Sequence, residues 1–357
     1  MEFSPIWRRI QRSLFPRIED CLGPLTEEHR KIVAILEIVR TWDQVRQSRR
    51  GTGRPPHDGW PIARAFVAKA ILNLSSTRAL IERLQADATL RRILGFRTGR
   101  PLPHESAFSR VFGVLARTEI PERTHAALVD RFVKDSGIAH AALDASAIPA
   151  REKARNTRKS VAVKIKRKRG RPKRGETVPP PEVSGVARIL PMTPARMKRT
   201  LPGDCSWGAK MNSHGKYEVW KGYKLHVSVV EGGLPVSCLL TSAKLHDSQA
   251  APFLLKKTAR KVQGYCLADA AYDAASPKGL GLVPVIDQKP RRGEKIPMEP
   301  DRARRYKART QAERFFVRLK DEFGGRMIFV RGNRKVMAHL MYGVLGILAD
   351  QLLGSGS

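Results

Sequence analysis

The chain has 357 residues, 41% of them apolar, and its 67 Lys and Arg residues against 33 Asp and Glu residues give a formal net charge of +34. This length has room for two or three domains, and the charge favours nucleic acid as the partner over an anionic membrane surface, because cations placed on phosphates release counterions. We expect neither a membrane span nor a secretory leader, since no apolar run reaches about 20 residues and residues 1–15 lack an uninterrupted apolar stretch.

The first region, residues 1–136, has the pattern of an all-α domain. Apolar residues recur at helical spacing between Ile32 and Val39, and further short helices follow. A last helix beginning at Glu105 after a Gly/Pro break is typical of a helix-turn-helix-like unit, in which Arg110 would contact DNA. The alternative for this region is a small helical bundle that makes no DNA contact.

From residue 137 to residue 353 the pattern changes to an α/β domain with a mixed sheet flanked by helices. Short apolar runs predict buried strands, and longer amphipathic or apolar runs predict helices. The predicted strands fall in residues 138–150, 222–230, 234–243, 263–269 and 281–288, and the predicted helices in 246–262, 302–323 and 334–353.

Residues 151–219 interrupt this pattern and are expected to form a basic, flexible insertion. Its core, Arg169-Gly170-Arg171-Pro172, resembles the AT-hook, a short motif that binds the DNA minor groove. Arg169 and Arg171 would enter a narrow A·T-rich groove, and the glycine between them allows a close approach. The alternative is a solvated run of charge that binds any DNA. Residues 354–357, GSGS, are interpreted as a linker scar.

Three acids lie where metal-dependent chemistry would need them. Asp144 lies inside an apolar strand, where a lone carboxylate is unfavourable unless it is paired or binds a metal. Asp269 ends another apolar strand, at the sheet edge where ligands of α/β proteins usually bind. Glu313 lies in the middle of a predicted helix. Each acid taken singly has a simpler interpretation, a helix cap for an Asp or a solvated side chain for the Glu.

The helix around Glu313 carries more information. Tyr306, Arg309, Glu313 and Lys320 are separated by three, four and seven positions, which places them within about 60° of one another on a helix surface. An acid flanked by two cations and a phenol can bind a metal while its neighbours hold phosphate oxygens. The alternative is an ordinary surface ion pair between Arg309 and Glu313.

This spacing, Tyr-x2-Arg-x3-Glu-x6-Lys, resembles the signature of a group of bacterial insertion-sequence transposases, which are DDE enzymes with an RNase H-like catalytic fold. Upstream blocks agree with the resemblance. The strand of the first aspartate resembles LDAS here, and the block of the second aspartate resembles LADAAYDA. The central strands and the start of the next helix resemble GYKLHV and KLHDSQ. The N-terminal domain of the group resembles PHESAFSRVF.

The resemblance implies an RNase H-like catalytic domain after an all-α domain. It also implies that Asp144, Asp269 and Glu313 hold two Mg²⁺ ions, with Mn²⁺ as the alternative. Water would free a 3′-hydroxyl at the transposon end, and that hydroxyl would attack target DNA. Arg309 and Lys320 would neutralise phosphate charge. The partner is double-stranded DNA, and the active complex is expected to be a homodimer or larger.

Other expectations follow from this assignment. Positions 269 and 313 are 44 apart, too close for the β-rich insertion that some members use to form DNA hairpins, so a hairpin route is not expected. Lys224 and His226 lie near Asp144 and either approach the DNA or form a packed polar face. The four cysteines are widely spaced, as expected for reduced thiols in a cytoplasmic, nucleoid-associated bacterial protein rather than for a zinc knuckle.

Two other classes remain as alternatives. The first is a catalytically silent derivative that only binds DNA, which would have lost one of the acids. The second is another RNase H-like nuclease, which would bind metals but would not need the Tyr-Arg-Glu-Lys helix. The sequence names neither the element ends nor the target site.

Overall fold

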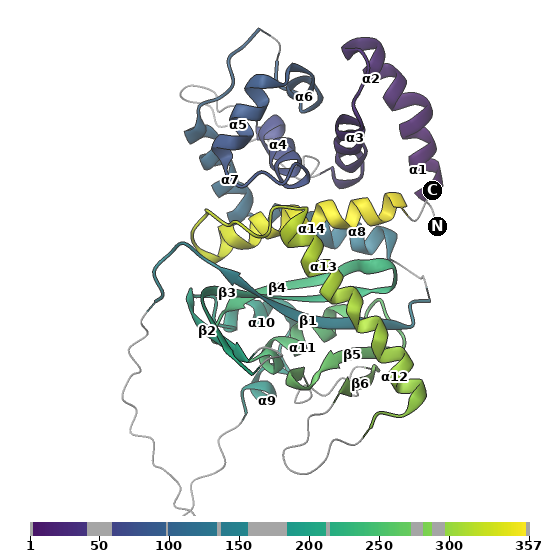
Figure 1. The fold of residues 1–357 in the computed structure, drawn as a ribbon, viewed down its shortest axis with the longest axis vertical. Coiled ribbons are helices and arrows are strands. Elements are labelled where there is room, and N and C mark those ends of the chain that lie inside the picture. Colours follow the sequence, from purple (N-terminus) through teal and green to yellow (C-terminus); the bar gives the residue numbers. More distant parts are fainter. Residues whose placement is uncertain are drawn as a thin grey trace, which may run out of the picture.

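The computed structural model describes residues 3–40, 59–97, 99–133, 137–155, 184–211, 215–272, 281–287 and 297–354. In these segments an N-terminal group of helices lies next to a domain built on a six-stranded mixed sheet, and this sheet has helices on both faces (Figure 1). The predicted class, an α/β domain with a mixed sheet preceded by an all-α region, is therefore confirmed.

The N-terminal helices begin where short polar side chains cap them. The Thr26 side chain accepts a hydrogen bond from the His29 backbone at 3.2 Å, and Ser76 and Asp87 cap two later helices in the same way. The helices are α1 (Phe3–Arg9), the π-helical η1 (Ile10–Leu14), α2 (Phe15–Leu22), α3 (Glu27–Val39), α4 (Gly59–Ile71), α5 (Thr77–Ala86), α6 (Ala88–Ile93), α7 (Glu105–Arg117) and α8 (Ile120–Phe132).

The sheet has the strand order β2-β3-β1-β5-β6, and β4 also pairs with β3. The β1–β5 and β5–β6 pairs are parallel, whereas the β1–β3, β2–β3 and β3–β4 pairs are antiparallel. The strands are β1 (His140–Pro149), β2 (Ser206–Met211), β3 (Tyr217–Val230), β4 (Leu234–Ser242), β5 (Tyr265–Asp269) and β6 (Val283–Asp287).

Helices cover the two faces of the sheet with separate apolar clusters. On one face α11 (Asp247–Thr258) packs with Leu143 and Cys266. On the other, α13 (Thr310–Asp321) packs with Ala142 and Leu267. Because neighbouring residues of a strand point to opposite faces, β1 and β5 each contribute to both clusters.

Helix α14 (Asn333–Gly354) corrects the expectation that no apolar run is long enough to cross a membrane. Within its 22 residues, an 18-residue stretch has a mean hydropathy of 1.5, but 78% of this stretch is buried inside the protein. The helix runs between the N-terminal helices and the sheet (Figure 1). It is apolar on most sides because protein packs against it from both directions.

Part of the expected flexible insertion at residues 151–219 is ordered. Ile189, Met197 and Leu201 are buried in the same cluster as α11, which gives this basic stretch an apolar anchor. The ordered elements are α9 (Gly185–Ile189), α10 (Pro194–Thr200) and β2. The RGRP core with Arg169 and Arg171, like residues 355–357 of the expected scar, lies outside the described residues.

Candidate active site

A row of acids crosses three strands of the sheet. In the parallel β1–β5 pair, Ala142 lies opposite Leu267, so Asp144 and Asp269 follow two residues later at the same level. Asp269 in turn pairs directly with Asp287 of β6. Since side chains repeat their direction every second residue, the three carboxyl groups lie on one face of the sheet.

This face is the one that α13 covers. Ala142, Leu267 and Val285, each two residues before one of the acids, pack with Phe315 and Leu319 of α13 in one buried cluster. The apolar part of the face therefore anchors the helix, and the acids lie where this packed layer ends. The sheet and α13 together fix the place of the acid row.

The segment expected as one helix over residues 302–323 is divided. The structure has α12 (Pro300–Tyr306), a 3₁₀ turn over Lys307–Arg309, and α13. Arg309 keeps right-handed helical angles, φ −58° and ψ −27°, so the tightened turn does not redirect the chain. The signature side chains therefore still lie along one side of the segment.

Arg309 joins the helix acid to the strand acid. Its Nη2 donates to Oε1 of Glu313 at 2.6 Å, and its Nη1 lies 3.6 Å from Oδ1 of Asp144. The side chains of Arg309 and Asp144 are each 19% exposed, whereas that of Glu313 is 52% exposed. The guanidinium thus lies between two of the three predicted metal ligands.

The charge at this site is not balanced by Arg309 alone. Burial, with smaller contributions from Asp269 and Glu313, raises the pKa of Asp144 to about 6, although Arg309 and a backbone hydrogen bond lower it. A carboxylate in this position gains from additional positive charge. The site therefore has the electrostatic character expected of a cation-binding centre.

The acids do not converge on a single point. Among the residues that the structure describes, no three Asp, Glu, His or Cys side chains are close enough to share a metal ion. The Arg309 guanidinium lies between Asp144 and Glu313. The donor set still fits a hard divalent cation, because carboxylate oxygens are the ligands that Mg²⁺ and Mn²⁺ prefer and Asp144 lacks sufficient counter-charge.

The two other signature residues lie beside the acids. Nζ of Lys320 donates to Oγ of Ser146 at 2.7 Å, and Ser146 follows Asp144 by two residues on the same face. Burial is the largest cause of the lowered pKa of Lys320. The Tyr306 ring lies 5.8 Å from the Arg309 guanidinium, and burial and then Asp287, Asp269 and Glu313 raise the pKa of its hydroxyl.

Lys224 and His226 lie on the opposite face of the sheet. They pair with Ala147 and Ala145 of β1, which alternate with Asp144. Nζ of Lys224 donates to Oδ1 of Asp247 at 2.7 Å. The fully buried His226 contacts Thr241 at 2.9 Å, and burial lowers its pKa to about 4. Of the two interpretations of this pair, the geometry favours the packed polar face.

The remaining predicted residues are not at the acid row. Arg110 is exposed on α7, in the helical region that α14 separates from the sheet (Figure 1). Asp247, the ion-pair partner of Lys224, is the first residue of α11, after the N-cap His246.

Asp287 is the residue that sequence reasoning missed. It ends the apolar strand β6 in the same way that Asp269 ends β5, and this shared position was the available signal. The parallel pairing of the two strands could not be read from the sequence. Only this pairing brings Asp287 beside Asp269.

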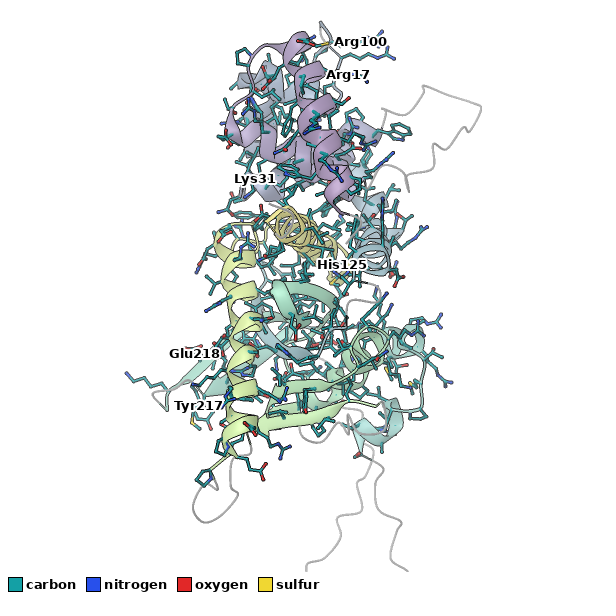
Figure 2. The ribbon with its side chains drawn as sticks, turned by 90° about the vertical axis from the view of Figure 1, so that its right-hand side faces the viewer. Arg17, Lys31, Arg100, His125, Tyr217 and Glu218 are labelled. Carbon is teal, nitrogen blue, oxygen red and sulfur yellow. The ribbon has the colours of Figure 1, made fainter. Side chains whose placement is uncertain are left out.

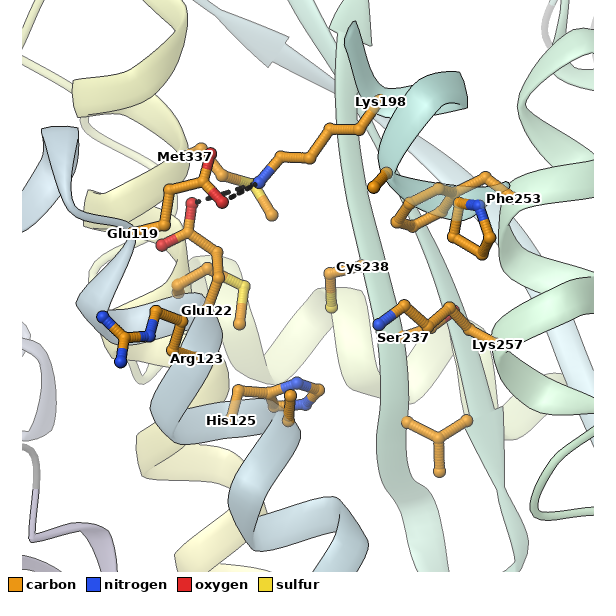
Figure 3. A pocket seen from close by; sticks show the side chains of 15 residues that line it. Glu119, Glu122, Arg123, His125, Lys198, Ser237, Cys238, Phe253, Lys257 and Met337 are labelled. Carbon is orange, nitrogen blue, oxygen red and sulfur yellow. Dashed lines mark ion pairs between the residues drawn. The ribbon is translucent and has the colours of Figure 1, made fainter. Parts of the chain in front are cut away.

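One described cavity lies away from the acid row. It has a volume of about 280 Å³ and lies between α8, α10, β4 and α14, with no acid of the row in its lining (Figure 3). Lys198 of α10 lies 2.8 Å from Glu119 and 4.0 Å from Glu122 of α8. Burial raises the pKa of Glu122 to about 7.

Comparison with known families agrees with this division of the chain. A family described as the transposase DDE domain matches residues 135–348, and one described as a transposase domain matches residues 19–113. No curated protein and no solved structure gives a significant match.

Proposed function

This chain belongs to the DDE transposase family, whose DDE domain matches residues 135–348. We propose that Asp144, Asp269 and Glu313 are its catalytic acids. They would cut DNA at the ends of the parent element and join the freed 3′ ends to target DNA. The observation that carries this assignment is the contact of Arg309 with both Asp144 and Glu313 beside the row of strand acids.

Enzymes of this family use divalent metal ions, and we propose two Mg²⁺ ions here, with Mn²⁺ as a substitute. When bound, such a pair activates the attacking oxygen and stabilises the leaving oxygen. Asp144 is fixed in the centre of β1. Asp269 is oriented by the Ala271 backbone, whose N–H donates to its Oδ1 at 3.0 Å. Glu313 is half exposed and can turn toward the strand acids from α13.

Arg309 has two roles in this proposal. Without DNA it offsets part of the negative charge of Asp144 and Glu313, which reduces the repulsion between these two acids. With DNA its planar guanidinium can bind two phosphate oxygens at once, which a lysine cannot do. Its release from the acids would then coincide with the arrival of the substrate.

Lys320 places a second cation near the reacting phosphate. Its hydrogen bond to Ser146 holds the ammonium group over β1, two residues beyond Asp144. Positive charge fixed at this position stabilises the negative charge that develops on the phosphate oxygens during cleavage. Lys320 would bind phosphate and position it, while the acids perform the chemistry.

We also assign the chain to the group with the Tyr-Arg-Glu-Lys signature. The spacing of Tyr306, Arg309, Glu313 and Lys320 supports this, as does their position on one side of the α12–α13 segment beside the acids. The substrate is double-stranded DNA, comprising element ends and target. The active complex would contain at least two copies, one for each element end.

The test is a cleavage and joining assay with Mg²⁺ on duplexes that carry the ends of the parent element. Asp144→Ala, Asp269→Ala and Glu313→Ala should each reduce both steps to background and leave DNA binding intact. Arg309→Ala and Lys320→Ala should lower the rate about 100-fold.

Arg309→Lys should retain part of the activity, because it keeps the charge and loses the second hydrogen bond to phosphate. The matched control is Arg30→Ala, a 43% exposed cation that pairs with Glu19 in the N-terminal region, away from the acid row. Full activity in any one of the three acid variants would refute the assignment of that acid.

A further inference from the structure

An exposed apolar surface lies on the hairpin formed by β2 and the first half of β3. Trp207, Met211, Tyr217 and Val219 are 61%, 62%, 74% and 62% exposed. We call these four side chains the hairpin stripe. Large apolar side chains gathered in this way on a soluble protein mark an interaction site more often than chance exposure.

The strand pairing places the whole hairpin stripe on one face. Met211 lies opposite Tyr217, and Ala209 lies opposite Val219. Trp207 precedes Ala209 by two residues in β2. Residues opposite each other in an antiparallel pair share a face, as do alternate residues of one strand. The four side chains therefore form a single surface and not a scatter of exposed residues.

The other face of the hairpin is covered by one of its own side chains, Trp220. Trp220 lies over Gly208, where an added Cβ would come within 2.7 Å of the Trp220 ring. Nε1 of Trp220 donates to the Tyr223 carbonyl at 3.0 Å, and Nζ of Lys224 lies 6.0 Å from the ring. The hairpin thus buries one aromatic ring on its inner face and leaves the hairpin stripe open on the other.

The hairpin stripe faces the same side as the catalytic acids. In the β1–β3 pair Asp144 lies opposite Val227, and alternation along β3 leads from Val227 through Tyr223 to Val219 and Tyr217. Figure 2 shows the hairpin end, with Tyr217, projecting from the sheet on the side where α13 lies. DNA that reaches the acids on this side would pass the hairpin stripe.

Lysines lie on and beside the hairpin stripe. Lys221 lies opposite Trp207 and shares its face. Lys210 lies on the other face of the hairpin, opposite Glu218, and its Nζ is 3.6 Å from that carboxylate. Lys210 is also near enough to Lys320 to contribute, after burial, to the lowered pKa of Lys320. Since Lys320 donates to Ser146 of β1, the cations of the hairpin lie near those of the acid row.

We propose that the hairpin stripe is a stacking platform for unpaired DNA bases next to the cut. Aromatic rings between cations bind single strands in this way, because every base has a π-face and the cations bind its phosphates. Bases inside a duplex are covered by their neighbours, so the platform would act on the opened end. The inference rests on the proposed function, since it takes the acid row as the place of cutting.

A second copy of the chain fits the hairpin stripe less well. A stable protein interface buries about 800 Å² on each partner, more than four side chains provide. The flanking lysines and the net charge of +34 would also repel an identical molecule. Charge and size therefore both favour the nucleic acid.

The test compares two DNA duplexes of one sequence, one fully paired and one with the last bases of one strand left unpaired and labelled with 2-aminopurine. Binding is measured with EDTA present, so the result does not depend on the acids or on metal. The variants are Trp207→Ala with Tyr217→Ala, the conservative pair Trp207→Phe with Tyr217→Phe, and Trp60→Ala as an exposed tryptophan of the N-terminal region.

Wild-type protein should bind the open-ended duplex about tenfold more tightly than the paired duplex and quench the 2-aminopurine fluorescence. The double alanine variant should lose this preference and the quenching while its affinity for the paired duplex stays unchanged. The double phenylalanine variant and Trp60→Ala should behave as wild type. Tyr217→Ala alone, at a 74% exposed site, provides the same test if the double variant fails to fold.

Three outcomes would overturn the proposal. The first is an equal loss of affinity on both duplexes, which would make the hairpin a general electrostatic contact. The second is no change on either duplex. The third is a change of sedimentation in the alanine variants without DNA, which would identify the hairpin stripe as a protein interface. A variant of the acid row that keeps DNA binding but loses cleavage would test the proposed catalytic acids and not the hairpin stripe.

Discussion

At the scale of single residues, the site is governed by a shortage of positive charge. Asp144 is largely covered and lies beside Asp269 and Glu313, and Arg309 is the cation that contacts both Asp144 and Glu313. A buried carboxylate in this environment holds its proton to higher pH than it does in the unfolded chain. Protonation, Arg309 and a divalent metal are therefore three alternative ways to neutralise the same group.

This competition predicts how stability depends on pH. The folded pKa of Asp144, about 6, lies above its ordinary value of 3.8. The contribution of Asp144 is therefore fully present below pH 4 and is lost as pH rises through 6. Without metal, the free energy of unfolding of the wild type should fall by about 3 kcal/mol across this window because of Asp144, and Asp144→Asn should not show this fall.

Urea unfolding at several pH values, with EDTA present, measures this difference. Asp301→Asn, on the surface of α12, is the control and should follow the wild-type profile. Parallel profiles for wild type and Asp144→Asn would mean that Asp144 is not the buried, proton-binding group described above.

A second prediction concerns Asp287, which pairs with Asp269 across β5 and β6. A fourth negative charge beside the metal ligands should strengthen the binding of a divalent ion. Asp287→Asn should weaken Mn²⁺ binding about tenfold, the size of effect typical for groups that support metal ligands. Titration followed by electron paramagnetic resonance measures the affinity independently of catalysis, and an unchanged value would remove Asp287 from the site.

At the scale of elements, polar contacts add to the apolar packing that joins the parts of the fold. The α10 helix, within the stretch expected to be flexible, reaches α8 through Lys198, which lies near Glu119 and Glu122. Oε2 of Glu122 is buried and has no hydrogen-bond partner. The cavity in Figure 3 thus lies where the N-terminal region, the inserted segment and the sheet meet.

This junction should be weakened by rising pH. The folded pKa of Glu122, about 7, lies above its ordinary value of 4.5, so its contribution is present below pH 4.5 and is lost as pH rises through 7. Over this range the free energy of unfolding of the wild type should fall by about 3 kcal/mol because of Glu122, and Glu122→Gln should not show this fall. Glu119→Gln is the matched control, because Glu119 pairs with the same Lys198 but is 44% exposed.

Thermal melting at pH 5 and pH 8 measures the effect. The gap between the melting temperatures of Glu122→Gln and wild type should widen toward pH 8, in favour of the variant, while Glu119→Gln should show no such trend. A gap that is the same at both pH values would show that Glu122 stays charged in the folded protein.

At the scale of the whole molecule, a charge of +34 makes DNA binding strongly dependent on salt. Charge alone does not distinguish sequences, so specificity needs a motif that reads the groove. The predicted reader is the RGRP core, whose residues lie outside the described part of the chain. Its function therefore stays a prediction from the sequence.

Arg169→Ala with Arg171→Ala should weaken binding to A·T-rich duplexes more than to G·C-rich ones, because the narrow A·T minor groove attracts inserted arginine. Binding isotherms on the two duplexes at several salt concentrations separate this effect from a general loss of charge. Lys166→Ala with Lys168→Ala removes the same charge outside the core and serves as the control. Equal losses on both duplexes would leave the segment as a nonspecific tether.

The sequence alone determined the local features of this protein. Apolar periodicity indicated the helical region and five of the six strands, and the spacing of Tyr306, Arg309, Glu313 and Lys320 indicated one functional side of a helix. These features depend on residues near one another in the chain, and such patterns follow from helix and strand geometry. The sixth strand, β2, fell within the range expected to be a flexible insertion, because the alternation of Trp207, Ala209 and Met211 is short and contains Gly208, which weakens a strand signal.

Tertiary structure decided what depends on pairing between distant segments. The parallel pairing of β5 with β6 brought Asp287 beside Asp269, and the register of β3 turned Lys224 away from Asp144. A shift of one residue in register moves a side chain to the other face, and no local pattern fixes that register for strands far apart in the chain. The contact of Arg309 with both acids likewise arises only when α13 packs on the sheet.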